Sequence, residues 1–393
     1  MASDLNAGLP VTVLFYALYY LSFGVYPIDN HRRNRLETGF NKTEVLKLAC
    51  HDGKMSEPPP EPILDLIEAF RRSKTMFTAV NLGVFEHLAA GPASAATLAP
   101  GLKVDALSLE RLLAACTSLG LLRRSTDGCY SNAAVASRYL LRGSPDTLAG
   151  YILYSDQALY RLWEHLDDAI REGSHRWTQV FGAGGSIFSH FFRTPEAKHD
   201  FILGMHGFGR ISSPAVVAAF DLSRFRRLVD LGGATGHLAI AACERYPSLH
   251  ATVLDLPEVI EEARPHVVAS AASARIQLLP GDLFSDPLPP ADLYYTGRIL
   301  HDWSEDKVKT LLARIHEALP PGGGYLIGEM LLDDDFTGPV HAHMQSLNML
   351  VCTEGRERSA AQYRVLLESA GFRRVEARRT GATLDAVLAS KPE

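Results

Sequence analysis

From Phe225 to the end of the chain, short apolar segments alternate with amphipathic ones, and this alternation restricts the possible folds more than any other feature. Seven segments read as strands: RRLVDLGG, HATVLDLP, RIQLLPGDLF, ADLYYTGRIL, GYLIGEMLL, FRRVEARRT and LDAVLASK. Segments such as GHLAIAACERYP and DKVKTLLARIHEALPPGG have the apolar spacing of helices. The pattern predicts an α/β fold with a mostly parallel, doubly wound sheet, whose ligands bind outside the carboxyl ends of the strands.

The preceding segment, from residue 63 to about residue 180, reads as helical. Apolar residues recur at three- and four-residue spacing from Ile63 to Leu88, with a break at Asn81–Gly83. The segment LLRRSTDGCYSN then predicts a hairpin turning at Asp127-Gly128. Two helices and a hairpin form the outline of a winged helix. The helix predicted over VDALSLERLLAACTSLGLL, just before the hairpin, carries Leu-Leu-Ala-Ala-Cys instead of a basic face, so we expect packing or dimerisation rather than DNA binding.

Charge and cysteine content exclude several classes of protein. The 393 residues carry 39 Lys and Arg against 45 Asp and Glu, a net charge of −6 that does not suggest nucleic acid as a partner. The five cysteines are scattered without a CxxC pair, which argues against a disulfide framework and a structural zinc site. The composition therefore fits a reducing compartment, and we expect a cytoplasmic protein.

The start of the chain holds a run of 17 residues without a charge, Val11 to Pro27. A membrane span needs about 20 apolar residues, so a buried or dimer-packing helix is favoured, although contact of residues 11–27 with a membrane stays possible. A signal peptide fits poorly because no basic residue precedes the run. The later EPPPEP segment reads as a linker. The expected organisation is an N-terminal extension (1–62), a helical winged-helix domain (63–215) and a sheet domain (216–393).

The first predicted strand ends in a glycine-rich turn, Asp230-Leu231-Gly232-Gly233-Ala234-Thr235-Gly236. Glycines let a backbone turn sharply and approach a ligand closely, and the following helix offers free N–H groups. A dinucleotide fingerprint would need glycine at position 237, where this chain has histidine. The pattern instead suits S-adenosylmethionine. Alone it is weak evidence, because many strand–helix corners are glycine-rich for packing only.

The next two strand ends carry acidic residues. Asp255 lies 25 residues after Asp230, about where an acidic residue accepts ribose hydroxyls, although it could also cap the following helix. Asp282 and Leu283, after Gly281, could contact an adenine ring, or could belong to a simple turn. Three strand ends at one edge of a sheet favour a nucleoside site.

The fourth strand end reads Arg298-Ile299-Leu300-His301-Asp302-Trp303. A lone histidine near an apolar strand is more often structural, but His301 would face the same crevice, and histidine suits a general base near neutral pH. Glu329 and Glu357 could orient or tune it, although spacing alone does not assign them and surface glutamates are the default. The other histidines lack the spacing of a metal site, so we expect no metal.

Several segments together resemble a known family. DLGGATG, LDLPEVI, GDLFSDPLP, ILHDWSEDK, PGGGYLIGEMLLDD and SLNMLVCTEGRERS occur in the order found in plant-type, small-molecule class I O-methyltransferases, and in particular in the acetylserotonin O-methyltransferases and the methyltransferase portion of acetylserotonin O-methyltransferase-like protein. The resemblance spans roughly residues 63–391. It implies a Rossmann-like S-adenosylmethionine-binding domain behind a helical dimerisation domain, a homodimer, and methyl transfer to a hydroxyl of a small aromatic acceptor.

The resemblance also implies roles for individual residues. The expected catalytic residues are the base His301 and its flanking acids Glu329 and Glu357. The expected cofactor-binding residues are Gly232 for the methionine moiety, Asp255 for the ribose, Gly281, Asp282 and Leu283 for the adenine, and Arg298. Asp302, Asn348 and Cys352 are the expected substrate-binding residues.

Four positions depart from the family pattern. Ala234 replaces the central glycine of the turn, and Cys352 stands where the acetylserotonin enzymes have a substrate-binding glutamine. Phe192 and Gly209 stand where those enzymes have a tyrosine and a tryptophan that contact the cofactor. Two functions therefore stay open: an active O-methyltransferase, and a catalytically weak S-adenosylmethionine-binding protein that acts through partners.

Overall fold

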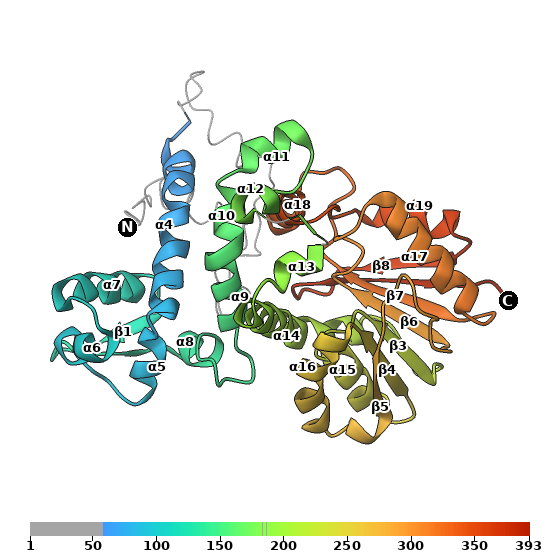
Figure 1. Ribbon diagram of the computed structural model, residues 1–393, viewed down its shortest axis with the longest axis horizontal. Coiled ribbons are helices and arrows are strands. Elements are labelled where there is room, and N and C mark those ends of the chain that lie inside the picture. Colours follow the sequence, from blue (N-terminus) through green and yellow to red (C-terminus); the bar gives the residue numbers. More distant parts are fainter. Residues whose placement is uncertain (1–57, 183, 186) are drawn as a thin grey trace, which may run out of the picture. The chain divides into compact units, whose positions relative to one another are not determined.

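The computed structural model describes residues 58–182, 184–185 and 187–393 (Figure 1). Contacts divide the chain between residues 67 and 68. Of the first part, residues 58–67 are described and contain the beginning of α4 (Glu61–Asn81). The second part contains all the other described elements. The prediction for residues 11–27 lies outside the described residues. Within them, no helix is both long enough and apolar enough to cross a bilayer.

The helical part begins with a small winged-helix arrangement and continues into longer helices. Its elements are α4, α5 (Val84–Ala89), α6 (Ala95–Leu102), α7 (Ala106–Ser118), β1 (Leu122–Arg124), β2 (Tyr130–Asn132), α8 (Ala134–Tyr139), α9 (Ala149–Tyr154), the π-helical turn η1 (Ser155–Leu159), α10 (Tyr160–Trp163), α11 (Leu166–Glu172), α12 (Trp177–Phe181), α13 (Ile187–Phe191) and α14 (Pro195–Ala218). The antiparallel pair β1–β2 confirms the predicted hairpin.

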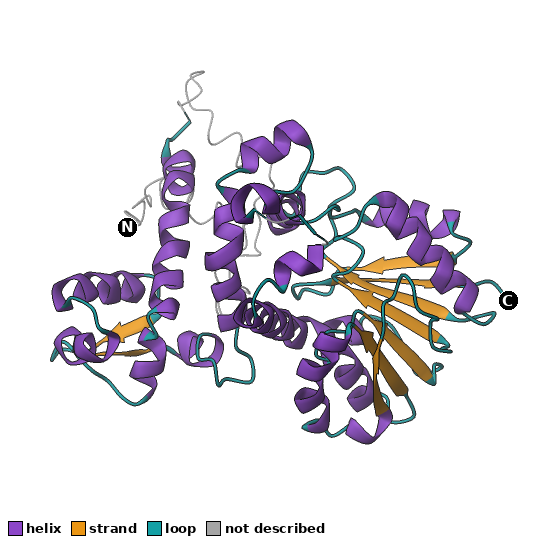
Figure 2. Ribbon diagram, viewed as in Figure 1, coloured by secondary structure: helices purple, strands orange, loops and turns teal. Residues whose placement is uncertain are grey.

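The sheet domain follows the predicted alternation of strands and helices (Figure 2). Its elements are β3 (Arg227–Leu231), α15 (His237–Arg245), β4 (His250–Asp255), α16 (Pro257–Val268), the 3₁₀ turn η2 (Ser273–Arg275), β5 (Ile276–Pro280), β6 (Leu293–Gly297), α17 (Glu305–Ala318), β7 (Gly324–Glu329), α18 (Val340–Cys352), α19 (Ala360–Ser369), β8 (Arg373–Arg378) and β9 (Asp385–Ser390).

The seven strands are ordered β5-β4-β3-β6-β7-β9-β8. The first five strands in this order pair in parallel, and β9 runs antiparallel to both β7 and β8. The chain leaves β3 towards β4 on one side and later returns to β6 on the other, so β3 and β6 flank a topological switch point. A crevice at such a point, outside the carboxyl ends of the strands, is where doubly wound sheets bind ligands.

Two apolar layers fix the sheet between its helices. On one face, α14, α15 and α16 pack against the sheet through residues such as Val216, Leu238 and Ile260, which are at most 2% exposed. On the other face, α17 and α19 pack through residues such as Leu311 and Leu367 (Figure 1). Because both faces are covered, the central strands are apolar on both sides, which explains why their sequences read as continuous apolar runs.

Two helices beside the crevice were not predicted from the sequence. The 24-residue α14 contains Pro214 and several glycines, which weaken a helical pattern. Gly204 and Gly207 let α14 approach the segment that leads into α9, because a Cβ at either position would overlap Tyr151 or the Thr147 carbonyl. The second helix is α18. The predicted domain boundary after residue 215 stays a prediction, and α14 continues across it.

Candidate active site

A cavity of about 310 Å³ lies at the carboxyl ends of the parallel strands. Ten of the residues named from the sequence line it: Gly232, Asp255, Gly281, Asp282, Leu283, Arg298, His301, Asp302, Asn348 and Cys352. Glu329 and Glu357 do not line it but lie behind His301. The structure therefore brings together residues that are spread over 120 positions of sequence.

The glycine-rich turn after β3 forms one wall of this cavity. Gly232 has a φ of +67°, and a Cβ there would press against the side chain of Ile299. Ala234 also lies in the left-handed region, with a φ of +48°, although it carries a Cβ. Such a conformation costs a non-glycine residue about 1 kcal/mol or more, so the substitution of the central glycine keeps the turn and adds strain.

Asp255, at the end of β4, ties this turn to the neighbouring strand. Its Oδ2 accepts a 2.8 Å hydrogen bond from the backbone N–H of Ala234, and its Oδ1 accepts one of 2.7 Å from the N–H of Leu256. It is not the cap of α16, because Leu256 holds that position without a side-chain bond. Each carboxylate oxygen keeps a further lone pair for a ligand hydroxyl. Burial raises the pKa of Asp255 to about 6.

Asp282 follows β5 and is exposed at the cavity edge. Its Oδ1 accepts a 2.8 Å hydrogen bond from the N–H of Phe284, so the side chain does form the local turn considered from the sequence. Its other oxygen accepts no hydrogen bond from a described side chain or N–H, and Leu283 beside it lines the cavity. A carboxylate next to an apolar side chain can accept from an amino group while the apolar group covers a ring.

Arg298 holds an unusual backbone conformation at the end of β6. Its φ is +57°, and its N–H donates to the carbonyl of Gly328 at 3.0 Å. The guanidinium carbon lies 5.3 Å from the ring centre of Phe208. Its Nε is buried and has no hydrogen-bond partner among the described residues. A guanidinium with a spare donor at a cavity wall can bind an anion.

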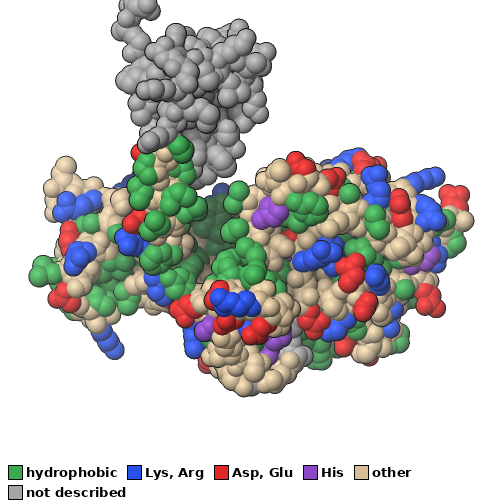
Figure 3. Space-filling view, turned by 90° about the horizontal axis from the view of Figure 1, so that it is seen from above, with side chains coloured by type: hydrophobic (Ala, Val, Ile, Leu, Met, Phe, Trp, Pro, Cys, Tyr) green, Lys and Arg blue, Asp and Glu red, His purple; other side chains and the backbone are tan. Residues whose placement is uncertain are grey.

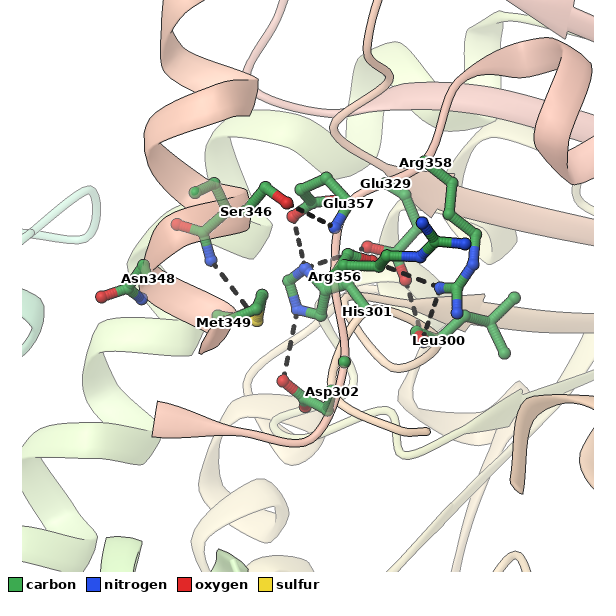
Figure 4. Close-up of polar contacts among 12 residues, drawn as sticks. Leu300, His301, Asp302, Glu329, Ser346, Asn348, Met349, Arg356, Glu357 and Arg358 are labelled. Atoms are coloured by element: carbon green, nitrogen blue, oxygen red, sulfur yellow. Dashed lines mark hydrogen bonds and ion pairs between the residues drawn. The ribbon is translucent and has the colours of Figure 1, made fainter. Parts of the chain in front are cut away.

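His301 is 2% exposed, and on the side away from the cavity its ring contacts Glu357 (Figure 4). Its Nδ1 lies 2.6 Å from Oε1 of Glu357, a short charge-assisted contact. Its Nε2 faces the cavity and lies 3.5 Å from Oδ1 of Asp302. With Nδ1–H donating to Glu357, Nε2 carries a free lone pair towards the cavity, which is the tautomer that a general base requires.

Glu329 fixes the backbone that carries His301. Its Oε1 accepts from the N–H groups of Ile299 at 3.1 Å and of Leu300 at 3.0 Å. Its Oε2 lies 3.4 Å from Nδ1 of His301. Burial, more than any other factor, raises the pKa of Glu329. The first role of this side chain is therefore to hold the loop, and the second is to place a carboxyl behind the imidazole.

His301, Glu329 and Glu357 offer three ligand atoms within 4.8 Å of one another, a spacing that a metal ion could use. The details favour a shared proton instead. The 2.6 Å separation of His301 Nδ1 and Glu357 Oε1 is a hydrogen-bond distance, whereas Oε1 of Glu329 is already used by two backbone N–H groups. Oε2 of Glu329 and Oε2 of Glu357 are buried and make no hydrogen bond with a described residue, so an assay with a chelator decides between a shared proton and an ion.

Aromatic side chains from α9, from α13 and the residue after it, from α14 and from the segment between β6 and α17 line part of the cavity. The residues of this kind that line it are Tyr151, Tyr154, Phe188, Phe191, Phe192, Phe201 and Trp303. Asn348 on α18 is held by a 2.9 Å hydrogen bond from Trp163 Nε1 to its Oδ1, which leaves its amide N–H groups to donate. The Cys352 thiol donates to the carbonyl of Asn348 at 2.8 Å. This wall suits a flat apolar molecule with few polar groups.

Most of this aromatic wall was missed from the sequence. It comes from α9, α13 and α14, where aromatic residues at helical spacing read as ordinary core. Met205 on α14 also lines the cavity, as do the departures Phe192 and Gly209. His237 was noted only as a missing glycine, yet it lines the cavity too. The only sequence feature that marked this residue was the histidine itself, at a position after the turn where a dinucleotide fingerprint has glycine.

Comparison with known proteins identifies the family. The profile of the O-methyltransferase domain matches residues 163–373, and that of the O-methyltransferase dimerisation domain matches residues 64–142. The chain belongs to the O-methyltransferase family. Both domains of the family, the helical one and the sheet domain, are thus present in the order expected from the sequence.

Individual relatives agree with this assignment. Acetylserotonin O-methyltransferase of Bos taurus is 44% identical, over 82% of this chain and 95% of its own length. A Homo sapiens protein described as a probable bifunctional dTTP/UTP pyrophosphatase/methyltransferase is 40% identical over 92% of this chain, which spans 58% of that relative. The crystal structure of human N-acetylserotonin methyltransferase in complex with SAM has a TM-score of 0.81 at 40% identity, covering 86% of this chain and all of that one.

Proposed function

We propose that this O-methyltransferase transfers a methyl group from S-adenosyl-L-methionine to the hydroxyl of a small aromatic acceptor of the phenol or hydroxyindole type, with His301 as general base. The observation that carries the proposal is the placement of His301 at the cavity wall, with its Nδ1 bonded to Glu357 and its Nε2 towards the cavity. The relatives named for acetylserotonin and the structure in complex with SAM support the donor and the acceptor class.

The residues at the strand ends fit this donor. Asp255 keeps lone pairs for ribose hydroxyls, Asp282 and Leu283 flank a place for the adenine, and the Gly232 turn lets the backbone approach the amino-acid end. Arg298 offers a buried guanidinium nitrogen, Nε, that has no hydrogen-bond partner in the described part of the chain. When bound, S-adenosyl-L-methionine supplies an electrophilic methyl group on a positively charged sulfur.

The protein has two tasks in this reaction. It holds the acceptor oxygen in line with the methyl group, and such positioning can account for about 7–11 kcal/mol of the barrier at best. It also removes the hydroxyl proton, which passes to Nε2 of His301, while the negative charge of Glu357 stabilises the resulting imidazolium. Asp302, 3.5 Å from Nε2, lies where it can contact the same hydroxyl.

A transfer screen tests the proposal. Purified protein is incubated with S-adenosyl-L-methionine carrying a labelled methyl group and a panel of phenols and hydroxyindoles, and labelled products are identified by mass spectrometry. We expect label on the oxygen of at least one acceptor. Binding of the donor without transfer to any member of the panel would contradict the proposed activity and favour the binding-protein alternative.

Glutamine in place of Glu357 should change the pH dependence of turnover. Burial raises the pKa of Glu357 to about 8, and the ionised carboxylate is the form that accepts from Nδ1–H of His301. Turnover of the wild type should therefore fall as the pH drops below about 8, because Glu357 then gains a proton. In Glu357→Gln the plateau should fall about 10-fold or more and the acid limb should move to lower pH, since no carboxylate is left to titrate.

The measurement is kcat between about pH 6 and about pH 9.5 with the acceptor found in the screen. Glu354→Gln is the matched control, because Glu354 pairs with Lys307 at the surface, and its profile should follow the wild type. An unchanged profile in Glu357→Gln would remove the pair from the mechanism.

A chelator should leave turnover unchanged. A hydrogen bond accounts for the short distance between His301 and Glu357 within the group of His301, Glu329 and Glu357, and we expect neither transfer nor donor binding to need an ion. The check is kcat before and after dialysis against EDTA, with metal content measured in parallel. A loss of activity that returns with one divalent metal would contradict the assignment.

We also propose a homodimer. The helical part matches the dimerisation domain of the family, and Phe70, Leu107 and Val135 in that part are exposed apolar side chains. Light scattering of the purified protein measures the dimer.

Figure 3 shows basic and acidic side chains interspersed over the sheet domain on the face in view, which gives nucleic acid no continuous basic surface there. The cytoplasm stays our prediction for its location.

A further inference from the structure

His237, the first residue of α15, is fixed on one side and free on the other. Its Nδ1 lies 2.9 Å from the hydroxyl of Ser213 on α14. The ring lines the cavity and keeps part of its surface exposed to it. No described residue makes a hydrogen bond with Nε2. A buried ring that is oriented by one nitrogen has the other nitrogen available for a ligand.

The position of this ring depends on Gly209. A Cβ at residue 209 would overlap the Cγ, Cδ2 and Nε2 atoms of His237. Gly209 itself lines the cavity, as does the neighbouring Ser212. The ring therefore occupies space at the cavity wall that any side chain at residue 209 would take, and the glycine and the histidine form one structural unit.

The charges around His237 favour an anion. Arg298 lines the same cavity and has a buried Nε without a described partner. Burial first, and then the positive charges of Arg298 and of a protonated His266, lower the pKa of His237 to about 4. The ring is thus neutral at physiological pH. When the Ser213 hydroxyl donates to Nδ1, the ring proton lies on Nε2, which then acts as a donor.

We propose that His237 binds, together with Arg298, the carboxylate at the amino-acid end of S-adenosyl-L-methionine. The inference rests on the proposed function, since it assumes this donor in this cavity. The guanidinium of Arg298 would supply the charge and His237 a neutral N–H donor. His237 directly follows Gly236 of the glycine-rich turn. Its N–H group would therefore reach the carboxylate from the turn that shapes this end of the cavity.

The affinities for two nucleosides distinguish binding of the carboxylate by His237 from a general disturbance of the glycine-rich turn. S-adenosylhomocysteine carries the amino-acid end with its carboxylate, whereas 5′-methylthioadenosine has the same adenine, ribose and thioether without it. Calorimetric titration measures both affinities for the wild type and for His237→Ala. The variant should bind S-adenosylhomocysteine about 10-fold or more weakly, the effect of losing one hydrogen bond to a charged group. Its affinity for 5′-methylthioadenosine should stay within about two-fold.

Further variants keep the test decisive. His237→Gln retains an N–H donor and should recover part of the lost affinity, and Ser213→Ala should lose less than His237→Ala because the ring is present but no longer oriented. His250→Ala is the matched control, an exposed histidine at the start of β4 that does not line the cavity, and it should bind both nucleosides like the wild type. Thermal unfolding checks that each variant is folded, and the glutamine and Ser213 variants replace His237→Ala if it is not.

The outcomes are distinguishable. Equal losses for the two nucleosides in His237→Ala, or no loss for either, would overturn the role of His237 and leave the proposed function standing. If the wild type binds neither nucleoside, the proposed function itself fails. Weakened binding of S-adenosylhomocysteine alone supports the inference.

Discussion

Alanine at position 301 should lower kcat by about 10²–10⁴-fold, the usual contribution of a general base. The variant removes an imidazole that the structure places both at the cavity wall and in contact with a buried carboxylate, Glu357. Donor binding should be nearly unchanged, because all the residues assigned to the donor except Arg298 lie at other strand ends. The measurements are kcat with the acceptor found in the screen and the affinity for S-adenosylhomocysteine.

His301→Ala also removes the hydrogen-bond partner of Glu357 and leaves that buried carboxyl beside an empty space, so a loss of turnover could also come from a disturbed structure. His301→Gln or His301→Asn keeps a hydrogen-bond donor near Glu357 without a base of suitable strength, and both should lose turnover as strongly as the alanine variant. Turnover that stays near the wild-type value in all three would eliminate His301 as the base. Equal losses of turnover and of donor affinity would indicate a collapsed cavity instead.

Replacing Asp255 with alanine should weaken binding of S-adenosylhomocysteine by roughly 100-fold, which corresponds to two hydrogen bonds to a charged group at about 1.5 kcal/mol each. The loss should be similar for 5′-methylthioadenosine, because both nucleosides carry the ribose. For His237→Ala, by contrast, we expect a loss of affinity for S-adenosylhomocysteine only.

The pH dependence of binding gives an independent check on Asp255. Burial raises its pKa to about 6, and its ionised form accepts from the Ala234 N–H and would accept from ribose hydroxyls. Affinity of the wild type should therefore decrease as the pH falls through about 6. Asp255→Asn cannot ionise, so its affinity should be weak and should lack that step. Asp221→Asn, at an exposed surface turn, is the control. A wild-type affinity independent of pH, with normal binding by Asp255→Ala, would place the ribose elsewhere.

The sheet domain could be predicted from the sequence because its local and global signals agree. Apolar runs mark the strands, amphipathic runs mark the helices, and a doubly wound order places the strand ends together. These signals predict Asp255, Asp282 and His301 at one edge of the sheet, and all three line the cavity. The winged hairpin had an equally local signal at Asp127-Gly128, and β1 and β2 confirm it.

The aromatic wall and the contacts of His237 could not be predicted in this way. The glycines of α14 matter only through their close approach to α9, a contact between segments about 50 residues apart. His237 acquires its place from Gly209 and Ser213, which lie on a different helix. Likewise, Glu357 looked like a surface residue, and only the fold shows it buried with His301. These features depend on tertiary packing, which local sequence patterns do not encode.

Calorimetric titration of the purified wild-type chain with S-adenosylhomocysteine tests the central claim most directly, because donor binding at the strand ends is required by every role assigned above. We expect saturable binding of one molecule per chain that is lost in Asp255→Ala. The absence of binding by a folded wild-type protein, or binding that is unaffected in Asp255→Ala, would contradict the account.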